Sequence, residues 1–501
     1  MLLFCLAAFA ATAAGDGDRT PVHDPSVTVR IEIRDRSELA RLTRMISIED
    51  VRGNEVRAVA TARQLEAVEA AGWSWQILPA PVKAQSPTMC GDGWAEDDNR
   101  SWNCYPSYQQ YEALMLGYAA KYHNLCRLVE LGPTANTTRP HRLLALVISD
   151  NPDHQEDEPE VLLTSSMHGD ETSGFALMLR VIDHLIRDYG VDPDVSFLVD
   201  ETEIWINPLA NPDGTYFQGD DTVAGAIRFF TTDTGAASAV DANRNFPDFN
   251  DDNHPDGNPW WPETEAMMAL AETRSFALSA NFHDGAEVVN YPWDSVPRRH
   301  PDDLWFQALA RDWADLAQSD SPGGYLVDFD NGITNGWDWY ETHGSRQDFV
   351  TFFHGGREVT IELSKAKLLR SEMLDDMWQW NRRALLDFVA HAHRGIRGVV
   401  TDPSGKPLAA TIKVLGLDRE EDGSKARTDP AVGDFHRLLL PGLYDLRIEA
   451  TGYRAREIRA VAVVDGEATE IEVVLNPVLV RRPTGRRTPA REGNAAHGLQ
   501  R

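Results

Sequence analysis

The sequence predicts a central α/β domain with a small α+β domain before it and a β-sandwich after it. From about residue 105 to residue 393, short apolar runs typical of buried strands alternate with helical runs. Residues 26–80 carry a shorter mixture of strand and helix patterns, and residues 395–476 carry strand patterns alone. A length of 501 residues suits this division, because domains average roughly 150 residues.

The composition indicates a globular protein with a strong negative charge. The chain has 78 acidic and 48 basic side chains, so its formal net charge is −30. Such a charge repels phosphate backbones, and nucleic acid is therefore not expected among its partners. A hydrophobic share of 42% is enough to build packed cores, and the acidity favours a cationic substrate.

Residues 1–14 have the pattern of a signal peptide. The apolar run is shorter than the roughly 20 residues that span a bilayer, and it ends in small residues where a signal peptidase cuts. We therefore expect a secreted or periplasmic protein with no integral membrane segment in the mature chain; a buried N-terminal strand is the alternative. Removal of Cys5 leaves Cys90, Cys104 and Cys126, which allow one disulfide and one free thiol without indicating which pair forms.

The small N-terminal domain is predicted to alternate strands and helices. Apolar and polar residues alternate from residue 27 to residue 33, as in a half-buried strand. Ser37 is predicted to cap a first helix, and Thr61 with Gln64 forms a capping box for a second. The expected order is strand, helix, strand, helix, strand, and residues 81–104 are expected to form a linker.

Four apolar runs mark buried strands of the central domain: residues 161–166, 204–206, 279–282 and 359–363. A helix is expected from residue 172 to residue 189 with its apolar face inward. This alternation predicts a sheet covered by helices on both faces, with an active site on the loops at the strand ends. Residues 477–501 carry six arginines among Pro, Gly and Thr, and we expect them to be a disordered basic tail.

The strongest chemical signal is Met167-His168-Gly169-Asp170-Glu171, directly after a predicted strand. A histidine and a glutamate three residues apart at a strand-to-helix turn can point at one metal ion. Alone this pair is a weak signal, but four further motifs accompany it: Asn207–Gly214, Asp241–Phe246, Asn281–His283 and Thr360–Ser364.

Together these motifs resemble the zinc metallocarboxypeptidases, peptidase family M14, and within that family the regulatory carboxypeptidase N/E branch. The resemblance covers about residues 105–393 as the catalytic domain and residues 395–476 as the transthyretin-like β-sandwich that follows it in that branch. It implies a mixed sheet between layers of helices (α/β/α). It also implies one Zn²⁺ ion per chain, held by His168, Glu171 and His283.

The resemblance also implies the catalytic groups. Glu362 matches the general base, and its place inside an apolar run agrees, because a buried carboxylate is costly without a role or a partner. Arg228 is the one arginine between Gly214 and Asn243, and it is the candidate for polarising the scissile carbonyl. Asp241 is expected to serve in turn and cap chemistry rather than as a ligand.

Recognition of a free C-terminal carboxylate is implied for three residues. Arg244 offers a guanidinium fork and Asn243 an amide donor. Tyr340 matches the tyrosine that caps the substrate in that family.

The side-chain preference is implied by Asp294, which matches the branch's partner for a C-terminal Lys or Arg, and by its polar neighbour Gln347. Two residues depart from the branch. Asp284 stands where Gly is usual, and Arg346 stands where Met is usual. A cation at position 346 is expected either to neutralise Asp294 in part or to reshape the pocket.

The sequence therefore predicts an exported zinc carboxypeptidase that acts on peptide or protein C-termini and releases Lys or Arg through a zinc-activated water. Two alternatives stay open: the same zinc site acting on other amides such as cell-wall peptides, and a non-catalytic peptide-binding module. The N-terminal domain resembles the inhibitory pro-segments of other metallocarboxypeptidases only in size and class. Because the N/E branch generally lacks such a segment, we expect a docking or folding-aid domain. The oligomeric state is left open.

Overall fold

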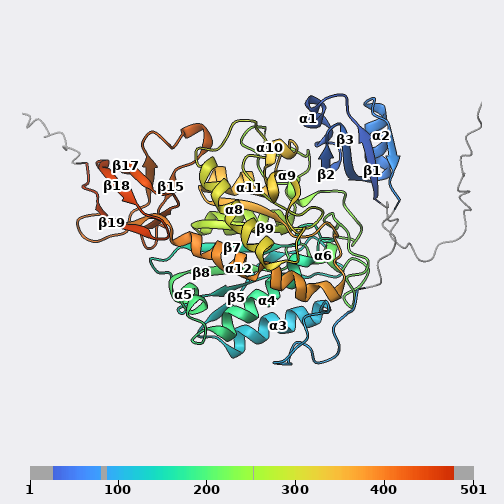
Figure 1. Cartoon of the computed structure of the whole chain (residues 1–501), viewed down its shortest axis with the longest axis horizontal. Helices are drawn as coiled ribbons and strands as arrows, with labels where there is room; N and C mark the ends of the chain where they lie inside the picture. The colour runs from blue at the N-terminus through green and yellow to red at the C-terminus, as the bar shows by residue number, and fades with distance from the viewer. Residues whose placement is uncertain (1–25, 80–86, 252, 479–501) are drawn as a thin grey trace, which may run out of the picture.

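The central domain is built on an eight-stranded mixed sheet (Figure 1). The structure is a computed structural model that describes residues 26–79, 87–251 and 253–478. The strand order is β11-β10-β12-β9-β7-β8-β6-β5. Pairs β7–β8, β7–β9, β9–β12 and β10–β11 are parallel, and the others are antiparallel. The strands are β5 (Cys126–Pro133), β6 (Arg142–Ile148), β7 (Glu160–Ser165), β8 (Glu203–Asn207), β9 (Phe276–His283), β10 (Val288–Tyr291), β11 (Ile333–Asn335) and β12 (Arg357–Glu362).

Helices cover both faces of this sheet, as the sequence predicted. The longer ones are α3 (Tyr108–Lys121), α4 (Ser173–Asp188), α5 (Pro193–Glu201), α7 (Pro262–Thr273), α8 (Asp303–Asp320) and α12 (Leu374–Ala390). Single turns are α6 (Pro212–Thr215), α9 (Asp328–Asn331), α10 (Gly336–Trp339) and α11 (Arg346–Phe349). The main apolar core lies between the sheet and α3, α4, α5, α8 and α12, whereas α7 packs over a smaller core around Trp205 and Phe276 on the other face.

The N-terminal domain is a four-stranded antiparallel sheet with two helices, in the strand order β2-β3-β1-β4. Its elements are β1 (Val27–Glu32), α1 (Leu39–Leu42), β2 (Ser47–Arg52), β3 (Glu55–Ala60), α2 (Ala62–Ala70) and β4 (Trp75–Ile77). The prediction of a single strand between the two helices is wrong. This segment is a hairpin of two strands, β2 and β3, that reverses at Gly53, whose φ of 62° suits glycine. The predicted Thr61–Gln64 capping box is confirmed, but Asp35 rather than Ser37 caps the first helical turn.

Residues 88–105 pack against the central domain instead of forming a free linker. Cys90 and Cys104 form a disulfide, which selects one of the pairs that the sequence left open. Tyr105 is fully buried in the main core, and Trp94 is nearly so. Cys126, on β5, is a buried free thiol.

The C-terminal domain is a β-sandwich of two sheets, with strand orders β16-β13-β19 and β15-β14-β17-β18. The strands are β13 (Gly395–Thr401), β14 (Ala410–Val414), β15 (Ala426–Arg427), β16 (Asp434–Arg437), β17 (Gly442–Ala450), β18 (Arg456–Val463) and β19 (Ala468–Val474). Apolar side chains from both sheets fill its core, as strand alternation predicted. The predicted signal peptide (1–14) and residues 479–501 of the predicted tail lie outside the described residues.

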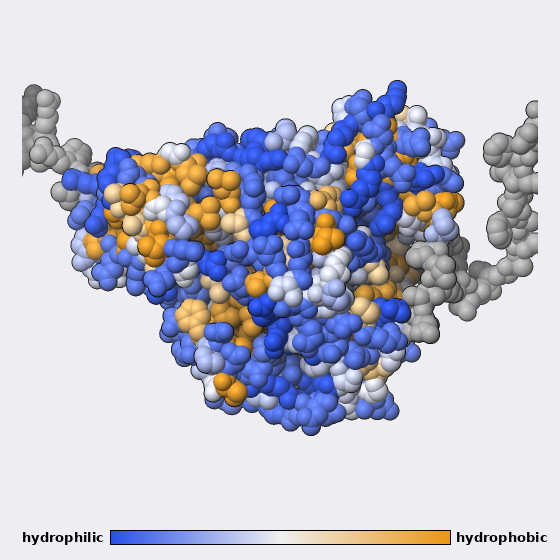
Figure 2. All heavy atoms as spheres, in the orientation of Figure 1, coloured by the Kyte–Doolittle hydropathy of each residue, from blue (hydrophilic) through white to orange (hydrophobic). Residues whose placement is uncertain are grey.

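The face in Figure 2 is mostly hydrophilic, and apolar side chains gather on it over the C-terminal sandwich. Exposed apolar residues of this domain include Leu443, Val464 and Val474. Across the described ranges of the chain, no helix combines the length and the apolarity that crossing a membrane requires.

A buried cluster of charges joins the sandwich to the central domain. Asp302, just before α8, accepts hydrogen bonds from Arg357 of β12 at 2.6 and 2.8 Å and from Arg437 of β16 at 2.8 Å. Arg437 also donates to Asp418 at 2.7 Å. All four residues are buried, so each charge depends on its partners.

Replacing Asp302 with alanine is expected to lower the free energy of unfolding by about 3–5 kcal/mol, because two arginines lose a buried counter-charge. Urea unfolding measures the loss. Asp303→Ala, at the neighbouring and more exposed position, is the matched control and is expected to change stability by less than about 1 kcal/mol. Equal effects of the two substitutions would contradict the role of Asp302.

Candidate active site

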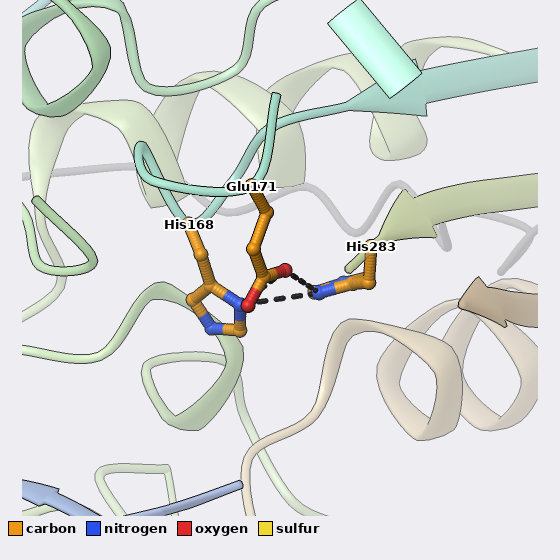
Figure 3. Close-up of side chains that lie close together, drawn as sticks. All are labelled: His168, Glu171 and His283. Carbon is orange, nitrogen blue, oxygen red and sulfur yellow. Dashed lines mark hydrogen bonds and ion pairs between the residues drawn. The ribbon is translucent and has the colours of Figure 1, made fainter. Parts of the chain in front are cut away.

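Three side chains with metal-binding groups converge at the carboxyl ends of β7 and β9. These strands are parallel neighbours, so the loop after β7, which carries His168 and Glu171, meets His283 at the end of β9. Figure 3 shows the three side chains pointing toward one another. His283 Nδ1 lies 2.8 Å from Glu171 Oε2 and 3.1 Å from His168 Nδ1, and His168 Nδ1 lies 3.0 Å from the same carboxylate oxygen. We call His168, Glu171 and His283, all buried, the metal triad.

Local packing fixes the turn that carries two members of the triad. Ser166 has a φ of 55°, and its hydroxyl donates to the backbone carbonyl of Glu171 at 2.6 Å. At Gly169 a Cβ atom would lie 2.4 Å from the carbonyl carbon of Gly214, so only glycine fits there. The loops after β7 and β8 are therefore held in close contact.

Asp241 orients His168. Its Oδ1 accepts a hydrogen bond from His168 Nε2 at 2.9 Å, which leaves Nδ1 facing the other two members of the triad. The same oxygen accepts from the backbone N–H of Asn243 at 2.8 Å, so the expected cap is present as well. The contact with the histidine was not predicted from the sequence. A carboxylate is a usual partner of a metal-binding histidine. The presence of Asp241 in the Asp241–Phe246 motif is therefore the feature of the sequence from which this contact could have been predicted.

Opposite charges allow Glu171 to stay ionised although it is buried. Arg228 Nη1 donates to its Oε1 at 2.7 Å, and Lys367 Nζ lies 3.7 Å from the same oxygen. Burial raises the pKa of Glu171, but His168 and His283 hold it well below the ordinary value. Burial also lowers the pKa of His283 to about 4. An ionised glutamate and a neutral histidine are the forms that bind a cation.

Glu362 stands beside the metal triad. It is the last residue of β12 and pairs in register with His283 on β9. Its Oε2 is buried and makes no hydrogen bond within the described ranges. Burial, and then the negative charge of Glu171, raises the pKa of Glu362 to about 8, so this carboxyl can exchange a proton near neutral pH.

The three predicted carboxylate-binding residues line the same cavity as the metal triad and Glu362. Arg244 Nη1 donates to the backbone carbonyl of Asn243 at 2.8 Å, and its guanidinium group lies 6.0 Å from the centre of the Tyr340 ring. The Asn243 side-chain oxygen accepts from the backbone N–H of Arg346 at 3.0 Å. The structure therefore brings Asn243, Arg244 and Tyr340 together at one side of the cavity.

Asp294 and Gln347 are neighbours, as the sequence predicted. Asp294 Oδ1 accepts hydrogen bonds from Gln347 Nε2 and from Asn290 Nδ2, both at 3.1 Å. Burial raises the pKa of Asp294, and the positive charge of Arg244 acts in the opposite direction. Across the described part of the chain, no arginine, lysine or histidine forms an ion pair with Asp294.

Arg346 does not neutralise Asp294, contrary to one expectation from the sequence. Its Nη2 donates to Glu358 at 3.0 Å, its Nη1 donates to Thr164, and the whole side chain is buried. Glu358 lies on β12, just before the predicted strand 359–363, and no role was predicted for it from the sequence. The other departure, Asp284, accepts hydrogen bonds from the backbone N–H and hydroxyl of Ser173 at the start of α4.

Two family models match this architecture. One, described as zinc carboxypeptidase, matches residues 111–384, and one described as a carboxypeptidase regulatory-like domain matches residues 395–476. The chain therefore belongs to the zinc carboxypeptidase family.

Among its relatives, carboxypeptidase M of Mus musculus is 34% identical over 70% of this chain and 79% of that protein. The catalytic chain of carboxypeptidase N of Rattus norvegicus is 35% identical over 70% of this chain and 81% of that protein. Carboxypeptidase D of Drosophila melanogaster is 35% identical over 75% of this chain, but the chain spans only 27% of that relative's length. The solved structure of carboxypeptidase A from Helicoverpa armigera superimposes on this chain with a TM-score of 0.56 and 17% identity, over 74% of this chain and 98% of that one. This similarity is one of fold.

A buried histidine supports the loop that follows Tyr340. His343 Nε2 lies 2.9 Å from the Glu341 carboxylate, and its Nδ1 lies 3.5 Å from Asp248 and 3.9 Å from Asp251. Burial lowers the pKa of His343, but Asp248 and Glu341 outweigh it and raise the pKa to about 9.

Because this pKa is above that of an unfolded histidine, about 6.5, the His343 contacts stabilise the fold fully below pH 6.5. The stabilisation is expected to be lost as the pH rises through about 9. We expect the difference in unfolding free energy between wild type and His343→Gln to shrink by about 3 kcal/mol across this range. Urea unfolding at several pH values measures it, and a constant difference would contradict the assignment.

Proposed function

We propose that this chain is an exported zinc-dependent carboxypeptidase that removes C-terminal Lys or Arg from peptides. The observation that carries the proposal is the convergence of the metal triad, Glu362 and Arg244 on one buried cavity. A metal-binding set, a base and a carboxylate clamp are the three parts that such a reaction needs. The export part of the proposal is supported only by the signal-like pattern of residues 1–14.

The metal triad fits zinc by the chemistry of its donors. Two imidazole nitrogens and one carboxylate oxygen form the ligand set of a catalytic zinc site with an open position. All three donor atoms lie within 3.1 Å of one another, and Asp241 fixes which nitrogen His168 presents. Zinc, when bound, supplies a Lewis acid that makes water more acidic and polarises a carbonyl group.

In this proposal Glu362 transfers protons, and Arg228 stabilises the negative charge that develops on the substrate. Glu362 takes the proton of the attacking water and passes it to the leaving amine, because it ends β12 beside His283 and its Oε2 has no hydrogen-bond partner within the described residues. Arg228 lines the same cavity and is buried, so its guanidinium group can donate to the oxygen of the scissile carbonyl as negative charge develops there.

The remaining contacts select a substrate. Arg244 pairs with the free carboxylate through its planar fork, Asn243 adds an amide donor, and Tyr340 covers the terminal residue. Asp294 receives the Lys or Arg side chain, with Gln347 beside it. The pairing of Arg346 with Glu358 supports this preference, because it leaves the Asp294 carboxylate available for a cation of the substrate.

Glu362→Gln is expected to lower kcat by about 10²–10⁴-fold, because it removes the base and keeps the shape. The variant is expected to retain one zinc per chain, measured by competition with a chelating dye. Glu287→Gln, near the start of β10 and paired with Lys365, is the matched control and should keep both turnover and zinc.

Unchanged turnover in Glu362→Gln would refute the assignment of the base. Loss of zinc together with turnover would instead place Glu362 in the metal site.

Asp294→Asn is expected to lower kcat/KM on peptides ending in Arg or Lys by about 30-fold or more, because a buried cation loses its counter-charge. Peptides ending in Leu are expected to change little. Asp315→Asn, on the exposed side of α8, is the control for altered net charge.

The substrate panel also includes peptides ending in diaminopimelate. Faster cleavage of these than of Arg or Lys peptides by the wild type would favour cell-wall peptides and overturn the proposed preference.

A further inference from the structure

A second group of metal-binding side chains lies between the central domain and the C-terminal sandwich. Asp157, in the loop before β7, meets Asp434 and His436 of β16. The three residues offer two carboxylate oxygens and one imidazole nitrogen, and these atoms all lie within 4.8 Å of one another. We call Asp157, Asp434 and His436 the interdomain cluster.

Strand geometry directs two members of this cluster to the same side of β16. Residues two apart in a strand point to one face, and Phe435 between them is buried in the core of the sandwich. Asp434 and His436 therefore point out of that core. Their side chains are nevertheless only 6% and 5% exposed, and His436 Nε2 lies 2.9 Å from Asp434 Oδ2. Asp157 of the central domain lies opposite them.

The negative charge of the cluster is not compensated. Asp157 Oδ1 is buried and has no hydrogen-bond partner within the described ranges. Asp429 adds a further negative charge beside Asp434. No arginine or lysine forms a hydrogen bond or an ion pair with any member of the cluster in the described part of the chain. Buried carboxylates are costly unless a cation or several donors satisfy them, so this site favours a bound cation.

Two arginines act on the cluster from nearby, but each already has a carboxylate partner. Arg274 pairs with Glu160 at 2.6 Å and also with Glu203. Arg397 Nη2 lies 4.0 Å from Glu470. Neither arginine is therefore free to supply the missing positive charge.

A similar group of side chains elsewhere in the chain shows the difference. The ligand atoms of Asp312, Asp387 and His391 also lie close together. Arg394 joins that group, with its Nη1 2.6 Å from His391 Nε2 and its Nη2 donating to Asp387 at 3.1 Å. That group has a cation of its own, whereas the interdomain cluster has none in direct contact.

A cavity of about 200 Å³ adjoins the interdomain cluster. Asp434 and His436 line it from the sandwich, and Glu160 and His354 line it from the central domain. This space is enough for several water molecules. Water can therefore fill the coordination positions that three protein ligands leave open on a metal ion.

We propose that the interdomain cluster is a second metal site, which binds Zn²⁺ and ties the C-terminal sandwich to the central domain. An imidazole nitrogen with two carboxylate oxygens suits zinc, whereas Ca²⁺ and Mg²⁺ prefer oxygen ligands alone. Because Asp157 belongs to one domain and β16 to the other, one bound ion links them.

This second site is separate from the metal triad. Asp157 lies just before β7, and His168 lies just after it. A strand of six residues is roughly 20 Å long, so the two sites lie near opposite edges of the sheet. Zinc binding at the interdomain cluster therefore does not depend on the proposed peptidase activity.

The first test counts zinc in the full chain, stripped of metal, reloaded with Zn²⁺ and freed of the excess. Elemental analysis is expected to give two zinc ions per chain for the wild type and one for Asp157→Asn and for His436→Gln. Loss of an outer partner of a ligand weakens metal binding roughly 10–100-fold, and we expect at least about 100-fold for loss of a ligand itself. Asp312→Asn makes the same change of charge in the group that contains Arg394 and is expected to retain two.

Hydrogen exchange followed by mass spectrometry gives a local readout to which the metal triad does not contribute. Added Zn²⁺ is expected to slow the exchange of residues 149–159 and of β16 in the wild type and in Asp312→Asn, but not in Asp157→Asn. The amides of β14, elsewhere in the sandwich, report whether each variant is folded.

The outcomes distinguish the two metal sites. Equal zinc content in the wild type, Asp157→Asn and His436→Gln overturns the interdomain site, and so does exchange of β16 in the wild type that does not respond to Zn²⁺. A single zinc ion in the wild type that both variants lose supports the interdomain site and refutes zinc binding by the metal triad. If the variants do not fold, the response of the wild type decides.

Discussion

The central constraint on this structure is a buried, ionised glutamate. Glu171 cannot keep its charge inside the protein unless opposite charges and hydrogen-bond donors surround it. The chain supplies them from separate elements: His168 from its own loop, His283 from β9, Arg228 from the segment after α6, and Lys367 from the segment after β12. The order of strands in the central sheet meets this need, because β7, β9 and β12 are adjacent and parallel and their carboxyl ends lead to His168, His283 and Lys367.

The same charges explain why the N-terminal domain fits where it does. Arg228 and Lys367 are cations whose partners lie partly in the central domain and partly in β2. Ser47 and Glu49 of β2 are the partners that the N-terminal domain provides, so both domains compensate these buried cations.

Sequence reasoning located the site because its signals are side chains at strand ends. The metal triad and Glu362 sit in or beside apolar runs and line one cavity in the structure. Asp294 and Gln347 contact each other but are not among the residues that line that cavity. The features that were not predicted from the sequence depend on contacts between segments that are distant in the chain. The hydrogen bond from Arg244 to the carbonyl of Ile48 has no side-chain signature, and the reversal at Gly53 was hidden inside one apolar stretch. The partner of Arg346 could not be chosen from sequence either, because Glu358 lies just before the predicted strand 359–363 and nothing in that position indicates a partner.

The pairing of Arg346 with Glu358 also changes how the chain's acidity bears on specificity. A net charge of −30 attracts any cation at long range, but salt screens that attraction within about 10 Å. Selection of a basic side chain needs a buried carboxylate that forms no ion pair within the protein. The charge of such a carboxylate is costly to bury, and a cation from the substrate offsets that cost. Asp294 meets both conditions within the described residues, since Gln347 and Asn290 give it hydrogen bonds but no charge. Under the proposed function, the surface charge attracts cationic substrates only weakly at physiological salt, and the choice between Arg and Leu is assigned to this one buried carboxylate.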